Sequence, residues 1–265
     1  MKKNLRNILA LSLGLMTTVA FAQDWGVDSR TRIDMSGDND KKSTTQRVTL
    51  GTTFGGSDWG IHVSSDVNYT LGTANGAEVM AELFEAYAST DLMGYASLTA
   101  GRQALNYGSG ALVSTNDWSA NRTTWDGMTF GLNLDMADVT VGYARRNSGA
   151  LNEEDNGNMW INAGGEFSGW NVNILYITDE DETNKPNAAS GIDISGDLMG
   201  ATVMASMNRD FNDGEMNMLG VSYAVNDDMT VTGSFTTYGD SAFHMEGTNF
   251  DNHGDYAATG NIGYL

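Results

Sequence analysis

The sequence has no cysteine and a single proline among its 265 residues. Without cysteine there is no disulfide framework and no thiol chemistry. The near absence of proline, together with 32 glycines, suits a chain that is mostly paired strand with tight turns. Basic residues are also scarce, since 14 Lys and Arg stand against 34 Asp and Glu. This balance argues against a nucleic-acid partner, because a polyanion is bound through clustered cations.

Long hydrophobic runs are missing as well. Beyond residue 22 no apolar stretch approaches the ~18–20 residues that a membrane-spanning helix needs. The mean hydropathy of −0.31 is that of a water-soluble protein. A membrane β-barrel escapes this criterion, because only every second strand residue touches lipid and the lumen is polar.

The N-terminus has the three parts of a secretory signal peptide. Lys2, Lys3 and Arg6 form a basic region, residues 8–19 form an apolar run, and Ala20-Phe21-Ala22 is a cleavage site of the A-x-A type. We therefore expect residues 1–22 to be removed and residues 23–265 to form one exported domain.

Connections that are alternately long and short divide the rest of the chain. Loops are predicted at residues 36–43, 72–78, 104–123, 148–157, 179–189, 209–214 and 239–254. Short turns are predicted between them at residues 55–58, 91–94, 135–138, 168–169, 197–200 and 226–228. Outer-membrane barrels have short periplasmic turns and longer extracellular loops. The sequence thus predicts an all-β fold, a transmembrane antiparallel up-and-down β-barrel of about 14 strands, in the outer membrane of a Gram-negative-type bacterium.

Within the predicted strands, apolar and polar residues alternate with a period of two. In residues 61–71 the apolar face holds Ile61, Val63 and Val67, and the other face holds His62 and Asp66. Small polar residues on the second face are typical of a water-filled lumen. The sequence therefore favours a channel over a solid-core sandwich.

Much of the acidic charge falls in predicted loops, for example at Glu153, Glu154, Asp155 and residues 179–182. These carboxylates either form a solvated surface or bind divalent cations such as Ca²⁺ at the mouth of the barrel, and no cluster has EF-hand spacing. A surface-interaction barrel with cation-binding loops and no transport is thus the alternative to a channel.

Residues 83–130 are the densest in distinctive residues. They contain the motifs Glu85-Ala86-Tyr87, Gly101-Arg102-Gln103-Ala104-Leu105-Asn106-Tyr107-Gly108, Asn116-Asp117-Trp118 and Trp125-Asp126-Gly127. In order and spacing this set resembles the alginate-export family of outer-membrane porins, of which this chain would be a short variant. The resemblance implies a β-barrel channel that passes small polar or charged solutes, including oligosaccharides.

A hairpin turning at residues 91–94 would place Glu85 opposite about Ala100, with Arg102 as its diagonal neighbour on the same, lumenal face. Such a pair either pins the strand register and tethers the following loop or belongs to a constriction that sorts solutes by charge. Residues 104–123 form the longest predicted loop, and we expect it to fold inward and narrow the pore.

Several other charged residues are expected to face the lumen. The complete set of candidate pore and constriction residues is Glu85, Tyr87, Arg102, Asp117, Arg122, Arg30, Arg32, Arg47, Asp66 and Arg146. Three histidines are too few for a confident metal site, and no nucleophile accompanies them. We expect no enzymatic activity and no cofactor. The expected partners are outer-membrane lipid, the barrel-assembly machinery and a small-molecule solute.

Overall fold

The computed structural model describes residues 23–34, 43–72, 79–117, 122–134, 136–147, 157–179, 188–240, 243 and 256–264. These residues form fourteen strands, which follow one another along the chain as β1 (Gln23–Asp34), β2 (Ser43–Gly55), β3 (Trp59–Thr70), β4 (Met80–Leu92), β5 (Ala96–Gln103), β6 (Thr124–Leu134), β7 (Ala137–Asn147), β8 (Asn158–Phe167), β9 (Trp170–Asp179), β10 (Ala188–Leu198), β11 (Ala201–Arg209), β12 (Glu215–Asn226), β13 (Met229–Tyr238) and β14 (Tyr256–Tyr264). No helix among them is long and apolar enough to cross a membrane.

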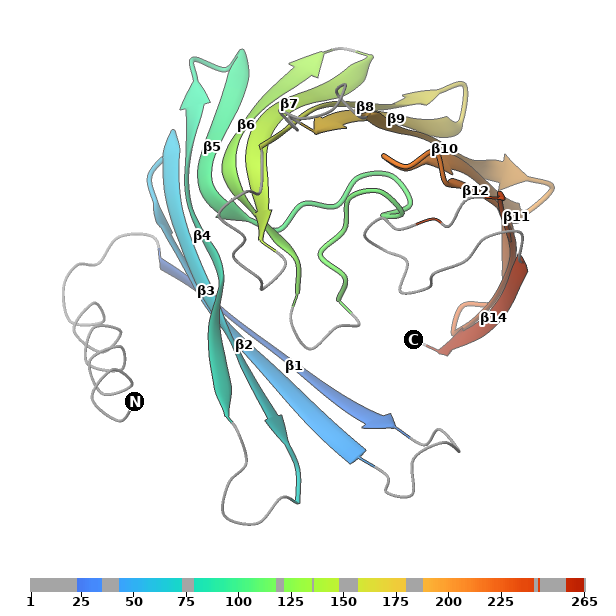
Figure 1. Ribbon diagram of the computed structural model, residues 1–265, viewed down its shortest axis with the longest axis horizontal. Helices are drawn as coiled ribbons and strands as arrows, with labels where there is room; N and C mark the ends of the chain where they lie inside the picture. Colours follow the sequence, from blue (N-terminus) through green and yellow to red (C-terminus); the bar gives the residue numbers. More distant parts are fainter. Residues whose placement is uncertain are drawn as a thin grey trace.

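Each strand pairs with its sequence neighbours, always antiparallel, in one sheet of order β1 to β14. The sheet curls around a central space (Figure 1). All six predicted short turns separate consecutive strands, and the predicted long loops separate the others. The all-β, up-and-down architecture predicted from the sequence is thus confirmed.

Two of the short turns show why they can be so tight. Ser168 and Gly169 have φ angles of 53° and 82°, and Met199 and Gly200 have 54° and 84°. Two successive left-handed residues define the type I′ turn, whose twist matches that of the flanking strands. The glycine in second place adopts this conformation without steric cost.

The outer face of the sheet is apolar and the inner face is polar. Exposed large hydrophobic residues recur at every second position on the outer face, as at Val141 and Tyr143 of β7 and at Ile174 and Tyr176 of β9. The alternate positions hold buried or half-buried polar residues such as Asp66, Thr129 and Asn162. A water-soluble protein has the reverse arrangement, whereas a membrane barrel with a polar lumen requires this one.

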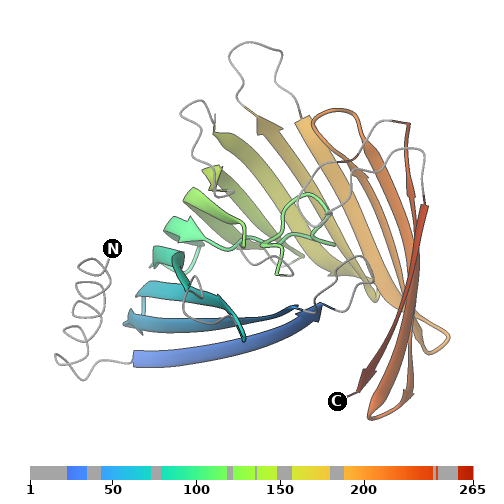
Figure 2. The same ribbon diagram turned by 60° about the horizontal axis from the view of Figure 1, so that its bottom comes forward.

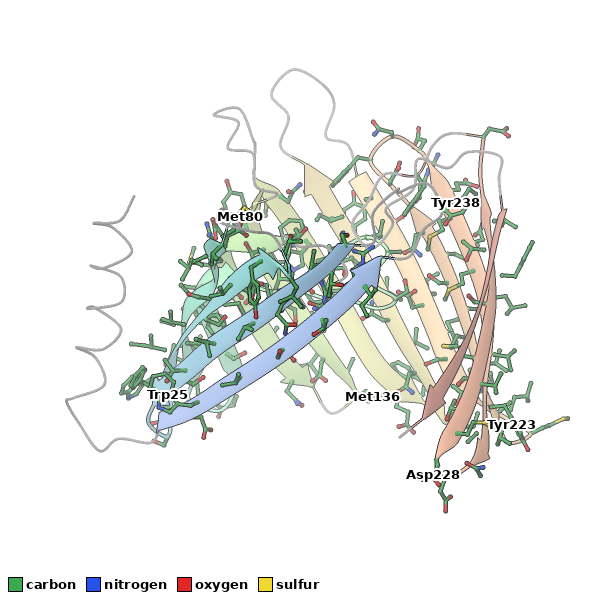
Figure 3. The ribbon with its side chains drawn as sticks, turned by 90° about the horizontal axis from the view of Figure 1, so that it is seen from below. Trp25, Met80, Met136, Tyr223, Asp228 and Tyr238 are labelled. Atoms are coloured by element: carbon green, nitrogen blue, oxygen red, sulfur yellow. The ribbon has the colours of Figure 1, made fainter. Side chains whose placement is uncertain are left out.

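Figure 3 shows that the two ends of the molecule differ. Trp25, Met136, Tyr223 and Asp228 lie toward the end that carries the short turns, whereas Met80 and Tyr238 lie toward the end of the long loops. Trp25, Trp59 and Tyr95 are exposed near the short-turn end. Aromatic side chains prefer the level of the lipid headgroups, so these residues are placed as a membrane-interface girdle would be.

The arc is not closed by strand pairing in the described part of the chain. There β1 pairs only with β2, and β14 pairs only with β13. Figure 2 shows the two edge strands on either side of an opening. The described residues therefore contain all fourteen predicted strands, but they lack the β1–β14 pairing that would close the ring.

We expect the protein to fractionate with the outer membrane and to migrate differently in SDS gels before and after heating. The reason is the apolar outer face, which water does not solvate but lipid or detergent does. Recovery in the soluble periplasmic fraction would contradict a membrane barrel.

A second prediction compares neighbouring positions of β7. Val141→Arg should lower the free energy of unfolding in lipid vesicles by about 2–4 kcal/mol, the cost of a lipid-facing arginine near mid-depth. Thr140→Arg, whose side chain points inward, is the matched control and should have a much smaller effect in a urea titration. Equal losses would mean that the two faces are wrongly assigned.

Candidate functional site

The long segment between β5 and β6 lies inside the arc. Figures 1 and 2 show its described part, residues 104–117 and 122–123, running across the central space rather than away from the sheet. We call this part the inserted segment. Its hydrogen bonds and apolar contacts determine how the interior of the barrel is partitioned.

Polar contacts attach the inserted segment to the far wall. The indole Nε1–H of Trp160 on β8 donates to Tyr107 Oη at 3.1 Å, and the hydroxyls of Ser109 and Ser206 on β11 are 3.1 Å apart. Burial raises the pKa of the Tyr107 phenol, and the bond from Trp160 partly opposes that rise. The phenol is therefore neutral at physiological pH and holds its place as a hydrogen-bond acceptor.

An apolar core forms where the segment meets the wall. Ala111, Leu112 and Val113 are buried against inward-facing side chains of six strands and against Phe243. The wall side of this core comprises Trp125, Ala144, Trp160, Leu175, Ile177, Ala189 and Met216. Burying a side chain such as Leu112 contributes roughly 1.5–3 kcal/mol, so the segment is held as a packed element.

Gly108 allows the closest approach of the segment to the wall. Its φ of 55° is left-handed, and a β-carbon at this position would overlap the carboxylate of Asp193 on β10. A residue with a side chain would be both strained and in collision here. Glycine is thus required where the inserted backbone rests on the β9–β10 wall.

The end of the segment is anchored to the opposite wall by Arg122. Its Nε and Nη2 donate to the two carboxylate oxygens of Asp66 on β3, at 2.8 and 2.6 Å. Thr49, which faces Asp66 across the β2–β3 ladder, accepts from the same Nη2 at 3.0 Å and donates to Asp66 at 2.6 Å. The Arg122 guanidinium also lies 3.2 Å from the ring centre of Phe84 on β4. The side chains of Arg122 and Asp66 are only 10% and 3% exposed, so water screens this pair weakly.

Asp117 extends the charge cluster toward the open space. Arg47 Nη1 donates to its backbone oxygen at 3.2 Å, and both Arg47 and Arg122 lie near its carboxylate, at 3.7 and 3.4 Å. The Asp117 side chain is 70% exposed. It is therefore the member of this cluster most accessible to a solute.

The predicted Glu85–Arg102 pair is wrong. In the β4–β5 ladder Arg102 is opposite Ala86 and Gly101 is opposite Tyr87, so Ala100 lies opposite Ala88 rather than near Glu85. An odd shift in register moves a side chain to the other face. Arg102 consequently points outward, where Nε and Nη2 donate to both oxygens of Asp126 on β6 at 2.7 Å. Arg102 therefore does not face the interior of the barrel.

Glu85 faces the lumen, with different partners. Its Oε1 accepts the backbone N–H of Ala104, the first residue of the inserted segment, at 3.2 Å. Its Oε2 lies 3.5 Å from Nε2 of His62, and the His62 ring stacks on Tyr87. Glu85 on the inside and the Arg102–Asp126 pair on the outside thus fix the points where the segment leaves and rejoins the wall. Residues of the distinctive motifs in the range 83–130 thus attach both ends of the inserted segment to the wall.

The other residues predicted to line the pore lie on different parts of the wall. Arg30 lies opposite Arg47 in the β1–β2 ladder, and Arg32 lies two positions further along the same face of β1. Arg146 pairs through its backbone with Trp125, and its side chain lies outside the described part of the structure, as does all of Trp118. The acidic residues 153–155 and 180–182 also lie outside it. Among the described residues no group of three or more His, Asp or Glu could hold a metal ion.

Sequence reasoning missed the apolar side of the site. Leu175 and Ile177 interrupt the polar inner face of β9, and residues 111–113 form an apolar triplet in an otherwise polar loop. Either irregularity alone could be noise in a barrel sequence. Together, the two apolar features indicate that the loop packs against β9.

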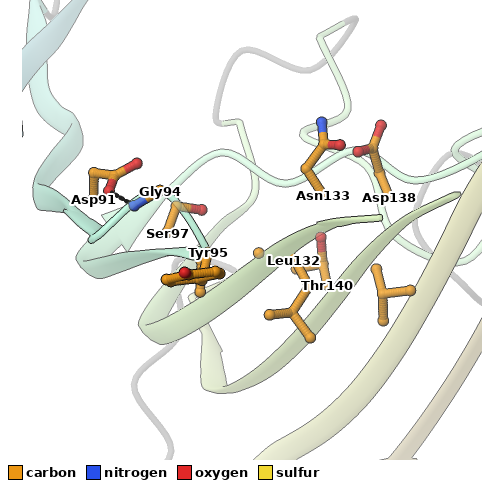
Figure 4. Close-up of a pocket in the computed structure, with 11 residues that line it drawn as sticks. Asp91, Gly94, Tyr95, Ser97, Leu132, Asn133, Asp138 and Thr140 are labelled. Carbon is orange, nitrogen blue, oxygen red and sulfur yellow. Dashed lines mark hydrogen bonds between the residues drawn. The ribbon is translucent and has the colours of Figure 1, made fainter. Parts of the chain in front are cut away.

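A shallow pocket of about 310 Å³ lies at the short-turn end, away from this site. Figure 4 shows Asn133 and Asp138 side by side on β6 and β7 and the contact of the Asp91 carboxylate with the N–H of Gly94 in the β4–β5 turn. This contact caps the turn and does not bring the pocket to the inserted segment.

Comparison with known proteins places the fold. No family model and no curated protein matches the sequence. Among solved structures, the chain is similar to OccD3 (OpdP) of Pseudomonas aeruginosa, with a TM-score of 0.60 and 13% identity over 86% of this chain and 60% of that one. It is similar to OccK8 (OprE) of the same organism, with a TM-score of 0.61 and 10% identity over 91% and 77%. A mutant of the Rh. blastica porin gives a TM-score of 0.56 and 11% identity over 82% and 84%.

These structures share the porin-like barrel fold with this chain. The chain spans about 60% of the length of OccD3. At 10–13% identity the comparison supports the architecture, and the chemistry of the lumen must come from the residues of this chain.

The two arginine pairs predict different stabilities. Arg122→Ala leaves Asp66 buried without its main partner and should cost about 3–5 kcal/mol of unfolding free energy. Arg102→Ala is the control, because Asp126 is 42% exposed, and it should cost about 1 kcal/mol or less. Urea titration of both variants in the same vesicles measures the difference, and comparable losses would contradict the structural role given to Arg122.

Proposed function

We propose that the protein is an outer-membrane channel for passive diffusion of small polar or charged solutes, including oligosaccharides. The observation that carries the proposal is the inserted segment, packed across a polar interior whose outer wall is apolar. Transport through such a channel needs no covalent step and no cofactor. Selection follows from the width left beside the segment and from the charges that line it.

The two lumenal walls differ in charge, which supports selection by charge: the β1–β3 side mixes arginines with Asp28, Asp34 and Asp66, whereas the charged residues described on the inner face of β7 to β10 are acidic. Arg30, Arg32, Arg47 and Arg122 lie on or against the β1–β3 side. Asp138, Glu166 and Asp193 lie on the inner face of β7 to β10. A field across the lumen orients a dipolar solute as it passes. The proposed constriction therefore consists of the inserted segment with Arg47, Asp66, Asp117 and Arg122, and Arg102 is removed from the set.

The proposed orientation follows from the signal-peptide pattern and the loop lengths. The short turns face the periplasm, and the long loops, including the acidic residues 153–155 and 179–182, face the outside. Folding into the membrane then depends on the barrel-assembly machinery.

A uronate oligosaccharide is one candidate solute. The resemblance of residues 83–130 to the alginate-export porins supports it, and the arginines of the β1–β2 wall offer the guanidinium groups that bind carboxylates. The acidic wall that faces them favours a smaller, dipolar solute instead. A surface-interaction barrel without transport remains the alternative of a different class.

Single-channel conductance in a planar bilayer tests the proposal. The purified protein should form discrete channels, and deletion of residues 109–116 should raise the conductance severalfold, because it removes the obstruction and its apolar anchor. Arg102→Ala should leave the conductance unchanged, since its side chain lies outside the lumen.

Two other outcomes are informative. A correctly inserted barrel that never conducts would support the surface-interaction alternative. Channels with the same conductance in the wild type and in the deletion variant would mean that the inserted segment does not limit the pore.

A further inference from the structure

The outer face of β9 to β12 has a hollow of about 450 Å³ near the long-loop end. Two of its lining residues flank the β11–β12 loop, since Arg209 is the last residue of β11 and Glu215 is the first of β12. Met216, next to Glu215, pairs with Tyr238, which Figure 3 places toward the long-loop end. The hollow therefore lies where the lipid-facing wall approaches the membrane surface. Its size falls within the range of small-molecule sites.

Apolar side chains line the part of the hollow that is further from the loop. Ile192 pairs with Ile174 on one side and with Met207 on the other, so the three side chains form one row on the lipid-facing side. Ile174 and Met207 are 51% and 61% exposed, so the protein itself leaves this row uncovered. An acyl chain lying on the row would cover it with hydrocarbon, as a bilayer requires.

The next row toward the loop is polar and charged. Ser190 pairs with both Tyr176 and Arg209, and Arg209 pairs with Glu215. The small side chain of Ser190 leaves space between its two larger neighbours. A cation and a carboxylate thus stand side by side at the edge of the apolar row. The two rows together match an amphiphile whose head group carries both charges.

The loop that carries the charged row is held by its own hydrogen bonds. Oδ1 of the buried Asp210 carboxylate accepts from the backbone N–H groups of Asn212 and Gly214, at 2.8 and 2.7 Å. The N–H of Asp210 donates to the backbone oxygen of Gly214 at 2.9 Å. The charged row is therefore ordered before a ligand arrives, which lowers the entropic cost of binding.

Arg209 differs from Arg102, the arginine on the outer face of β5. Arg102 donates through Nε and Nη2 to both oxygens of Asp126, at 2.7 Å each. Arg209 lies 3.1 Å from Asp213 through Nη2, and the Asp213 side chain is 74% exposed. A guanidinium has five N–H donors, so Arg209 retains donors for a phosphate.

The balance of charge selects the head group. Arg209 is accompanied by two carboxylates, Asp213 and Glu215, so the excess carboxylate repels an anionic head group. A zwitterionic head group with a primary ammonium offers a phosphate to Arg209 and N–H donors to Glu215. Charge-assisted hydrogen bonds of this kind are about twice as strong as neutral ones.

We propose that the hollow binds one phospholipid whose head group joins a phosphate to a primary ammonium, as in phosphatidylethanolamine. The phosphate accepts from Arg209, the ammonium donates to Glu215, and an acyl chain lies on the row centred on Ile192. Such a site requires the membrane barrel but no conduction, so it goes beyond the proposed channel function and does not depend on it.

Native mass spectrometry of the detergent-purified barrel tests the site by counting bound lipid. The probes share the same acyl chains: phosphatidylethanolamine, phosphatidylcholine, whose methylated nitrogen has no N–H donor, and phosphatidylglycerol, which is anionic. Phosphatidylethanolamine should half-saturate the wild type at the lowest concentration. Phosphatidylcholine should need about tenfold more, the equivalent of one charge-assisted hydrogen bond. Lipid A, a phosphorylated glycolipid, is the fourth probe.

Three variants assign each part of the head group to a residue. Glu215→Gln should remove the preference for phosphatidylethanolamine over phosphatidylcholine, because it removes the charge that attracts the ammonium. Arg209→Gln should weaken the binding of both lipids about tenfold, because both carry the phosphate. Arg102→Gln is the matched control, since Arg102 is an outer-face arginine that does not line the hollow, and it should bind lipid like the wild type. Heat-modifiable migration in SDS gels reports whether each variant is folded.

Other outcomes would overturn the site. Equal binding of the three phospholipids, or a preference that survives Glu215→Gln, would mean non-specific lipid contact only. Tighter binding of lipid A than of phosphatidylethanolamine would assign the hollow to a glycolipid and not to a zwitterionic phospholipid. A dimer that Arg209→Gln dissociates would assign it to a second copy of the chain.

Discussion

The ion pair between Arg122 and Asp66 links two parts of the wall that the chain itself keeps apart. Arg122 lies two residues before β6, whereas Asp66 and its partner Thr49 lie on β3 and β2. Earlier in the inserted segment, Ser109 reaches β11. The segment therefore spans the interior of the arc from β2 to β11. Each strand of the sheet pairs only with its neighbours, so the segment adds a connection across the diameter of the arc. The position of the inserted segment depends on that connection.

This arrangement explains why the inner face departs from a purely polar lumen. Polar side chains such as Thr129 and Asn162 can be hydrated on the inner wall. Leu175 and Ile177 would expose apolar surface to water there unless other apolar residues packed on them. The apolar residues 111–113 provide that cover. The wall left uncovered is polar and acidic around Asp193. The inserted segment thus divides one surface into a packed half, which holds the segment, and a polar half, which the segment leaves uncovered.

The strands and turns could be predicted from the sequence because each depends on residues close together in the chain. Alternation shows the outer face of β7 directly, and Ser168-Gly169 indicates a two-residue turn without any knowledge of the fold. The pairing of Glu85 could not be obtained in this way. The β4–β5 turn comprises residues 93–95, and the ladder beyond it places Arg102 opposite Ala86. An odd shift in the assumed register therefore assigned Arg102 to the wrong side of the wall. The Arg122–Asp66 contact, 56 residues apart, depends on the curvature of four strands and has no local signal.

The unpaired edges of β1 and β14 must also be accounted for if the sheet lies in a membrane. Lipid offers no hydrogen bonds, so backbone groups along an unpaired edge cannot remain unpaired inside a bilayer. In an up-and-down sheet with an even number of strands, the first and last strands run in opposite directions, so β1 and β14 can pair directly as an antiparallel ladder. The distance between these edges depends on how strongly the arc curves. The link from β2–β3 to β11 acts on that curvature, because it joins strands near both edges. The same contacts that place the inserted segment in the interior therefore also favour closure of the wall around it.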